Sequence, residues 1–312
     1  MLDAPIAAPL LVDALAGLTA SPKTLPCKWL YDAEGARLFE DITRLPEYYP
    51  TRTEMLILPR ASAAIAAACG PGVAVVEFGS GDGSKVSVLL SALERPSAYV
   101  PVDIAAEWLE AAAARVAAEQ PGLAVLPVVA DFTQLFPLPA ELPDGPRLGF
   151  FPGSTIGNFT PDEAVGFLRR ARDVLGHGAR MVLGADLVKS PVVLEAAYDD
   201  AQGVTAAFNL NLLARLNREA GADFLPDGFR HEARWNPALE RVEMHLVSRR
   251  EQVVRLGGQQ ISFAEGESIH TENSHKYRPE RLRELAEAGG WRDLAMWTDP
   301  AGLFSVWLLE AA

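Results

Sequence analysis

Residues 75–83 read Val-Val-Glu-Phe-Gly-Ser-Gly-Asp-Gly, a short apolar run that ends in three alternating glycines. The run Val73–Phe78 predicts a buried strand, and Ser84–Glu94 predicts the helix that follows it. Glycine is needed where a ligand approaches the backbone closely or where φ is positive. An ordinary turn between a strand and a helix does not need three alternating glycines, so this turn predicts a ligand site.

Short apolar runs and helical patterns alternate around this segment, which predicts an α/β fold with a largely parallel sheet. Further strands are expected at Ala98–Val102, Leu123–Val129, Leu148–Phe151 and Arg180–Ala185. Helices are expected at Ala105–Glu119 and at Pro161–Leu175, with Thr160 as the N-cap of the latter.

The pattern changes after Lys189. A helical stretch is expected over Val192–Arg218. Antiparallel strands are expected at Arg241–Arg249 and Gln252–Leu256, with a hairpin turn at Gly257–Gly258. A helix is then expected at Glu280–Ala288, followed by closing strands around Trp291–Trp297 and Phe304–Leu309. We therefore expect a Rossmann-like sheet domain at 53–188 plus 276–312. A second, α+β domain is expected at 1–52 plus 189–275.

The chain carries a formal net charge of −13, which disfavours nucleic acid and anionic membranes as partners. No apolar run reaches the roughly 18 residues that a membrane-spanning helix needs. Asp3 and Asp13 precede the first basic residue, Lys23, which is not the pattern of a signal peptide. The two cysteines, Cys27 and Cys69, indicate neither a disulfide framework nor a metal site. We expect a cytoplasmic monomer that acts on a small molecule.

Two kinds of cofactor compete for the glycine-rich turn. A dinucleotide site favours G-x-G-x-x-G, whereas this turn reads G-x-G-x-G. Glu77 lies two residues before the first glycine, where an acid suits a cationic ligand better than a pyrophosphate. S-adenosylmethionine carries a sulfonium and an ammonium group and no phosphate, so this charge argument favours it.

Acidic residues also follow the next two predicted strands. Asp103 can accept hydrogen bonds from both ribose hydroxyls, and Asp131 with Phe132 can bond the adenine amino group and cover its ring. Each acid by itself could equally cap a helix. Together they mark one crevice at the carboxyl edge of the strands, where sheets of this kind bind ligands.

Long motifs then identify the sequence as similar to a known family. These motifs are Ser21–Pro26, Lys28–Asp32, Ile42–Glu54, Gly153–Asn158, Tyr198–Asp200, Gly203–Asn209 and Thr271–Glu272 with Ser274. The chain resembles, over nearly its whole length, the L-histidine Nα-methyltransferases of ergothioneine biosynthesis, a branch of the class I methyltransferase fold. Leu210 and Asp82 depart from the family pattern, and we expect these departures to change the affinity for the substrate while leaving the activity intact.

The resemblance implies a role for each matching residue. The cofactor S-adenosylmethionine would be held by Tyr31, Gly79, Lys85, Asp103, Asp131 and Phe132. The amino and carboxylate groups of the substrate would be held by Tyr48, Gly153, Asn158 and Tyr198, with Tyr48 and Asn158 as the catalytic pair. The imidazole would be held by Glu272 and Ser274, with Met244 lining that side. The implied product is the Nα-trimethylated betaine hercynine, formed by three successive transfers.

The residue chemistry agrees with these roles. The amide of Asn158 offers donors and an acceptor, which suits a zwitterionic substrate. Alternation along a strand puts Glu272 and Ser274 on one face, so a carboxylate and a hydroxyl can meet the two imidazole nitrogens. Such a site rejects side chains that lack both polar groups, because its own groups would be left unpaired.

Three alternatives remain open at this point. The substrate could be another aromatic amino acid such as tryptophan, although an indole offers only one N–H to Glu272. The chain could instead be a nicotinamide-dependent oxidoreductase, or a non-catalytic binding module on the same fold. The five histidines match no zinc spacing, so we expect no metal. The sulfonium of the cofactor is already a reactive methyl donor, so we also expect no covalent intermediate.

Overall fold

The apolar run before the glycine-rich turn forms β2 (Ala74–Phe78), an inner strand of an eight-stranded sheet in the computed structural model, which describes residues 8–312. Residues 1–7, which open the expected second domain and include Asp3, lie outside the described residues. The described chain divides into two units, one of Pro50–Lys189 with His275–Ala312 and one of residues up to Tyr49 with Ser190–Ser274.

The sheet of the first unit runs in the order β13-β14-β7-β6-β2-β3-β4, and β5 also pairs with β3. Its other strands are β3 (Ala98–Asp103), β4 (Ala124–Val125), β5 (Val128–Val129), β6 (Arg147–Phe151), β7 (Arg180–Asp186), β13 (Trp291–Thr298) and β14 (Phe304–Ala311). The strands from β4 to β7 are parallel, whereas β14 is antiparallel to β7 and to β13. This arrangement confirms the expected Rossmann-like α/β sheet.

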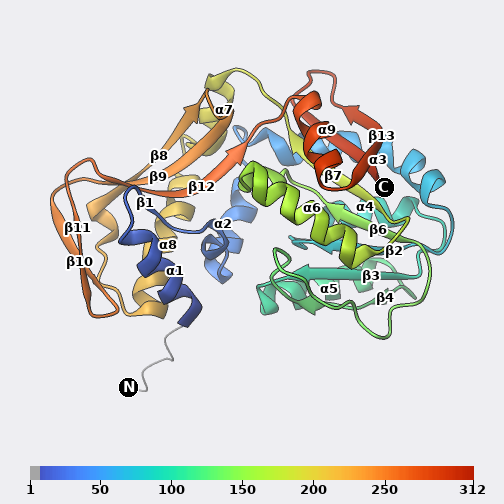
Figure 1. The fold of residues 1–312 in the computed structure, drawn as a ribbon, viewed down its shortest axis with the longest axis horizontal. Helices are drawn as coiled ribbons and strands as arrows, with labels where there is room; N and C mark the ends of the chain where they lie inside the picture. Colours follow the sequence, from blue (N-terminus) through green and yellow to red (C-terminus); the bar gives the residue numbers. More distant parts are fainter. Residues whose placement is uncertain (1–7) are drawn as a thin grey trace. The chain divides into compact units, whose positions relative to one another are not determined.

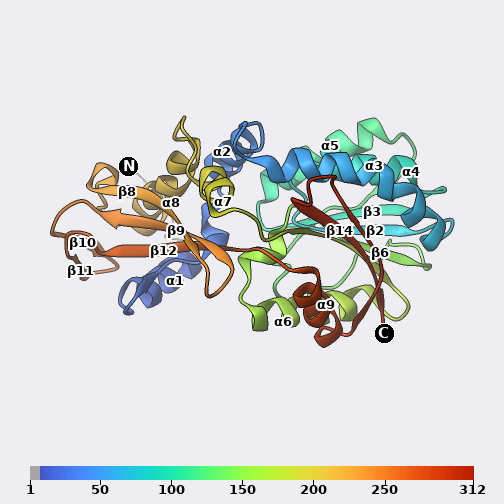
Figure 2. The same cartoon turned by 90° about the horizontal axis from the view of Figure 1, so that it is seen from above.

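Helices cover both faces of this sheet (Figure 2). They are α3 (Tyr49–Cys69), α4 (Ser84–Ala92), α5 (Ala106–Glu119), α6 (Pro161–Leu175) and α9 (Pro279–Ala288). Side chains alternate between the faces of a strand, so neighbouring residues of β2 enter different cores. Val75 packs in the core that holds Leu58 of α3, and Val76 packs in the core that holds Phe167 of α6 and Leu285 of α9.

The expected cap of α6 is present. The Thr160 hydroxyl accepts from the backbone N–H of Glu163 at 3.4 Å, and the Glu163 carboxylate accepts from the Thr160 N–H at 2.8 Å. This reciprocal pair satisfies two N–H groups that a helix start would otherwise leave without partners.

The second unit contains a four-stranded sheet in the order β1-β12-β9-β8 and a separate hairpin of β10 and β11 (Figure 1). The strands are β1 (Lys23–Thr24), β8 (Phe229–Asn236), β9 (Arg241–Ser248), β10 (Gln252–Leu256), β11 (Gln259–Phe263) and β12 (Ser268–His275). The helices are α1 (Ala8–Leu18), α2 (Ala33–Thr43), α7 (Pro191–Tyr198) and α8 (Val204–Ala220), with short 3-10 turns at Cys27–Leu30 and Pro226–Gly228. This is the expected α+β organisation.

Three sequence expectations need correction. The strand expected at Leu123–Val129 is split into β4 and β5, because Pro127 between them has no N–H to give to the sheet. The helical stretch Val192–Arg218 is broken at residues 199–203. Helix α8 starts anew there because Asp200 accepts hydrogen bonds from the N–H groups of Val204 and Thr205. The strand around Arg241 pairs with β8 and β12, whereas the Gly257–Gly258 turn joins β10 to β11.

A buried ion cluster lies at the end of β7. The carboxylate of Asp186, which is fully buried, pairs with Lys189 at 2.6 Å and with Lys276 at 2.8 Å. Burial by itself raises the pKa of Asp186, but Lys276 and Lys189 lower it below its ordinary value. Burial lowers the pKa of Lys189 to about 8. The cluster therefore anchors Lys189 and Lys276, which lie next to two of the points where the chain passes between units.

Within residues 8–312, no helix combines the length and the apolar character that crossing a membrane requires.

Candidate active site

The glycine-rich turn after β2 leaves its backbone open. Gly79, Gly81 and Gly83 all have positive φ, at 79°, 50° and 77°. A Cβ on Gly81 would meet nothing within 4 Å, and a Cβ on Gly79 would meet only the ring of Phe132, at 3.5 Å. The Gly81 carbonyl accepts a hydrogen bond from the Trp108 indole at 2.7 Å. The turn is therefore held in a shape that lets a ligand approach its main chain.

Two predicted cofactor residues meet at this turn. Asp103 ends β3, and its carboxylate accepts hydrogen bonds from the N–H groups of Ser80 and Ala105. Burial raises the pKa of Asp103 despite these hydrogen bonds. Phe132 packs against Phe151 at 5.8 Å between ring centroids and also lies over Gly79. The structure thus brings Gly79, Asp103 and Phe132 to the carboxyl edge of the parallel strands, where such sheets bind ligands.

Asp131 lies two residues after the end of β5 and directly precedes Phe132. Its Oδ1 accepts hydrogen bonds from the backbone N–H of Thr133 at 2.9 Å and from the Thr133 hydroxyl at 2.5 Å. This local turn fixes the carboxylate beside the Phe132 ring. Both of these hydrogen bonds go to the same carboxylate oxygen, Oδ1.

Lys85 and Gly153 are joined by Glu54, which was not among the predicted site residues. The Lys85 ammonium pairs with the Glu54 carboxylate at 2.7 Å, and Glu54 also accepts from the Gly153 N–H at 2.9 and 3.1 Å. Glu54 is almost fully buried. Glu54 ends the family motif Ile42–Glu54, but its neighbours in sequence do not indicate that it contacts Lys85 and Gly153.

The role expected for Glu77 needs correction. Its carboxyl group is buried and lies 2.5 Å from the Tyr99 hydroxyl of the neighbouring strand β3. Burial raises the pKa of Glu77 well above its usual range, although the hydrogen bond with Tyr99 and the charge of Lys85 oppose the shift. Glu77 therefore supports the sheet through Tyr99, and the charge argument for S-adenosylmethionine, which was built on this acid, loses that support.

Asn158 ends a short 3-10 turn, Thr155–Asn158, after β6. This turn is fastened on both sides. The Ser154 hydroxyl accepts from the Asp186 N–H at 2.9 Å, and the Tyr277 hydroxyl donates to the Ile156 carbonyl at 3.1 Å. The position of Asn158 at the carboxyl edge of the sheet is therefore set by buried contacts.

In the second unit, Tyr48, Tyr198 and Ser274 lie together and are nearly fully buried. The hydroxyls of Tyr198 and Ser274 are 2.6 Å apart, and the rings of Tyr48 and Tyr198 meet edge to face at 6.2 Å between centroids. These residues come from α7, from β12 and from the segment before α3. The structure thus assembles three of the predicted substrate residues.

Glu272 and Met244 lie on paired strands beside this group. Glu272 is 8% exposed on β12, and Met244 is buried on β9. The Thr271 hydroxyl donates to the Met244 carbonyl at 3.1 Å. Burial, and next the charge of Glu272, raise the pKa of Tyr31. Tyr31 is therefore close to Glu272 and belongs to this unit, whereas the other predicted cofactor residues belong to the sheet unit.

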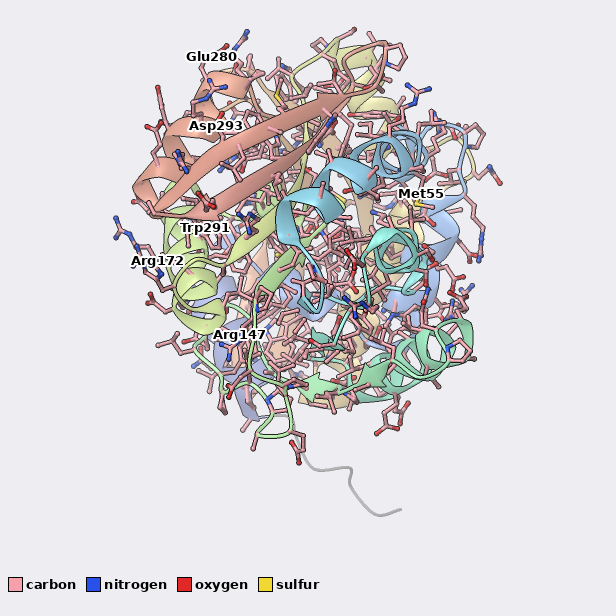
Figure 3. All side chains as sticks on the ribbon, turned by 90° about the vertical axis from the view of Figure 1, so that its right-hand side faces the viewer. Met55, Arg147, Arg172, Glu280, Trp291 and Asp293 are labelled. Atoms are coloured by element: carbon pink, nitrogen blue, oxygen red, sulfur yellow. The ribbon has the colours of Figure 1, made fainter. Side chains whose placement is uncertain are left out.

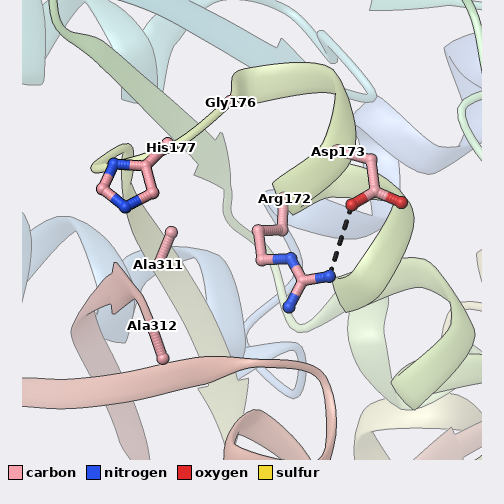
Figure 4. Close-up of a pocket in the computed structure, with 6 residues that line it drawn as sticks. All are labelled: Arg172, Asp173, Gly176, His177, Ala311 and Ala312. Carbon is pink, nitrogen blue, oxygen red and sulfur yellow. Dashed lines mark hydrogen bonds and ion pairs between the residues drawn. The ribbon is translucent and has the colours of Figure 1, made fainter.

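The structure also contains a surface pocket of about 420 Å³, lined by Arg172, Asp173, Gly176, His177, Ala311 and Ala312 (Figure 4). It lies between the end of α6, the start of β7 and the end of β14, which is the edge opposite the glycine-rich turn. Arg147 and Arg172 lie on the same side of the unit, and Arg147 donates to the last carbonyls of α6 (Figure 3). No predicted site residue lines this pocket.

Across residues 8–312, no group of three or more His, Cys, Asp or Glu side chains is arranged to hold a metal ion.

Comparison with known proteins gives a family match over nearly the whole chain. A family described as "Histidine-specific methyltransferase, SAM-dependent" matches residues 10–311. The chain is 49% identical to the histidine N-alpha-methyltransferase of Mycolicibacterium smegmatis, over 94% of this chain and 92% of that protein. It is 44% identical to the protein of the same name from Mycobacterium tuberculosis, with the same coverage. It is also 30% identical to ergothioneine biosynthesis protein 1 of Neurospora crassa, over 89% of this chain and 32% of that protein.

Proposed function

Because the chain belongs to the family of SAM-dependent, histidine-specific methyltransferases, we propose that it transfers methyl groups from S-adenosylmethionine to the α-amino nitrogen of L-histidine. The observation that carries this proposal is the family match over residues 10–311, together with the buried polar group of Tyr198, Glu272 and Ser274. The names of the two mycobacterial relatives support the same substrate and the same nitrogen.

The residues at the glycine-rich turn fit the cofactor. The turn leaves open space at Gly81, and the buried hydroxyl of Ser80 has no hydrogen-bond partner within residues 8–312. The Asp103 carboxylate can accept from two ribose hydroxyls, and the Phe132 ring can cover an adenine. When bound, S-adenosylmethionine supplies a methyl group that is already activated by the positive sulfur. Lys85 would meet the carboxylate of the cofactor, held in place by Glu54.

Recognition of histidine would use both ends of the amino acid. We assign the imidazole to Glu272 and Ser274, with Met244 as the apolar wall. We assign the amino and carboxylate groups to Tyr48, Gly153, Asn158 and Tyr198. The hydrogen bond between Tyr198 and Ser274 supports this division, because it would link the two halves of the substrate site.

The main task of the protein in this reaction is to align the substrate nitrogen with the methyl group of the cofactor. The amine must arrive without its extra proton, because an ammonium nitrogen has no lone pair to attack the methyl carbon. Asn158 and Tyr48 would orient that lone pair in line with the sulfur–methyl bond, and such orientation is worth several kcal/mol, roughly 7–11 in model reactions. Each of the first two transfers gives an ammonium that must release a proton, to water or to a neighbouring hydroxyl, before the next transfer. The face of Tyr48 would favour the positive charge that each transfer places on the nitrogen.

We propose that three transfers occur and that the product is hercynine, on the path to ergothioneine. The name of the Neurospora relative supports this pathway. We assign cofactor binding to the sheet unit and substrate recognition chiefly to the other unit. A cytoplasmic location is supported by the two free cysteines, and a monomer without nucleic-acid or membrane partners is supported by the net charge of −13.

A methyl-transfer assay with the twenty common amino acids tests the substrate. Histidine should be the best methyl acceptor by at least about 100-fold, because a site built for two polar partners discriminates strongly. Preference for tryptophan would show that the chemistry is right and the substrate wrong. Calorimetry with NAD and with S-adenosylmethionine tests the cofactor, and tight NAD binding without S-adenosylmethionine binding would contradict the whole proposal.

A further inference from the structure

Helix α7 ends at Tyr198, and its last carbonyl groups need hydrogen-bond donors from outside the helix. The Nε2 atom of His231, on strand β8, lies 2.7 Å from the Tyr198 carbonyl oxygen. A carbonyl can only accept a hydrogen bond, so Nε2 must carry the proton that is donated. His231 thereby caps the end of the helix that presents the Tyr198 side chain.

The opposite side of the His231 ring faces Asn209, a fully buried residue of α8. The Nδ2 atom of Asn209 lies 2.9 Å from His231 Nδ1 and 3.3 Å from the carbonyl oxygen of His245. That second carbonyl fixes the orientation of the amide, because a reversed amide would put two oxygens against each other. Asn209 therefore donates to Nδ1, and Nδ1 must be the ring nitrogen without a proton.

These contacts select one form of His231, the neutral imidazole with its proton on Nε2. Burial lowers the pKa of His231, although the carbonyl of Tyr198 and the charges of Asp199 and Asp200 oppose the shift. Asn209 is the last residue of the motif Gly203–Asn209, and none of the predicted site residues belongs to this motif. Asn209 belongs to α8, and the Asp200 side chain, two residues after Tyr198, accepts hydrogen bonds from the first N–H groups of that helix.

The side chain of Tyr198 leads from this cap to the proposed histidine site. Its hydroxyl lies 2.6 Å from the Ser274 hydroxyl, and its ring packs against Tyr48. A small shift of the end of α7 would therefore change the direction of the Ser274 hydroxyl, which has to meet one imidazole nitrogen.

We propose that Asn209 and His231 are positioning residues for substrate recognition, which hold the end of α7 so that the Tyr198–Ser274 pair stays set for the imidazole. The inference rests on the proposed function, because that function makes Tyr198 and Ser274 substrate residues. Asn209 and His231 themselves do not touch the substrate in this account. Asn209 keeps the proton of the His231 ring on Nε2, and Nε2 donates this proton in a hydrogen bond to the Tyr198 carbonyl.

Two substitutions at one position separate this role from a general packing role. His231→Gln places an amide nitrogen where Nε2 was and can still donate to the Tyr198 carbonyl. His231→Asn places its amide at the position of Nδ1, next to Asn209, and cannot reach that carbonyl. We expect the KM for histidine to rise about tenfold in His231→Asn, equivalent to about 1.4 kcal/mol. We expect a rise below about threefold in His231→Gln.

Binding of S-adenosylhomocysteine, measured by calorimetry, should stay within about twofold of wild type in both variants, since His231 shares no hydrogen-bond partner within residues 8–312 with the glycine-rich turn and belongs to the other unit. Equal KM values in both variants and wild type would overturn the inference. Parallel loss of histidine and S-adenosylhomocysteine binding in both variants would also overturn it, because that result means general damage. Histidine methylation by the wild type, measured alongside, tests the proposed function separately.

The tautomer can be observed without any substitution. In protein labelled with ¹⁵N at histidine, the His231 ring should show a protonated Nε2 and an unprotonated Nδ1 at pH 7. A ring protonated at Nδ1, or at both nitrogens, would overturn the inference even if a variant fails to fold.

Discussion

Removing the charge of Glu272 should weaken histidine binding while leaving cofactor binding almost unchanged. Glu272→Gln keeps the size of the side chain and replaces a carboxylate oxygen by an amide nitrogen. The wild-type side chain is 8% exposed, so solvent screens its charge poorly. A hydrogen bond to a charged group contributes about 1.5–3 kcal/mol, and its loss corresponds to about 10- to 150-fold in Kd.

The assay is calorimetric titration with histidine in the presence of S-adenosylhomocysteine, which occupies the cofactor site without reacting. Glu267→Gln serves as the matched control. It removes an acid just before the same strand β12, where Glu267 pairs with Lys23, and should change histidine affinity less than about twofold. If Glu272→Gln bound histidine like wild type, or lost histidine and S-adenosylhomocysteine equally, our assignment of Glu272 to the imidazole would be refuted.

Three further substitutions test other parts of the account. Asp103→Ala should weaken S-adenosylhomocysteine binding by about tenfold or more and histidine binding far less, measured by calorimetry, since it removes the proposed acceptor of two ribose hydroxyls. Asp186→Asn should lower the free energy of unfolding by about 3–5 kcal/mol in urea denaturation, because two buried lysines lose their partner. The exposed pair of Asp173 with Arg172 provides the control. Asp173→Asn should lower the free energy of unfolding by less than about 1 kcal/mol, and an equal loss in Asp173→Asn and Asp186→Asn would contradict the reasoning. Burial raises the pKa of Glu243, but hydrogen bonds led by Arg241 hold it at about 2, below its ordinary 4.5. The stability that this carboxylate contributes is fully present above pH 4.5 and is lost as the pH falls towards 2, and solvent screening keeps it well below the roughly 3 kcal/mol of the full shift. Glu243→Gln should therefore flatten the fall in unfolding free energy between pH 5 and pH 3, and an unchanged slope would contradict this.

Local sequence patterns predicted much of the sheet unit, because the signals there act over a few residues. The Thr160 cap with Glu163 and the glycine turn after β2 are both set by neighbours in sequence. The same reasoning failed at Pro127, where a missing N–H divides a strand, and at Asp200, where a side chain starts a new helix. In both places one residue outweighs the hydrophobic pattern around it.

The sequence named residues for the candidate site but could not predict the contacts between them. Tyr198 and Ser274 were both expected as substrate residues, but the hydrogen bond between them joins positions 76 residues apart. The links of Glu54 to Lys85 and of Asn209 to His231 depend equally on the tertiary fold. Glu77 illustrates the opposite failure: its place in the sequence predicted a charge beside a ligand, whereas the fold buries it against Tyr99.

The position of the transferred methyl groups tests the central claim most directly. Purified protein is incubated with histidine and S-adenosylmethionine that carries a ¹³C-labelled methyl group, and the product is examined by mass spectrometry and NMR. We expect a product with three equivalent labelled methyl groups on the α nitrogen and none on the ring. Label on the imidazole, or histidine recovered without label, would contradict it.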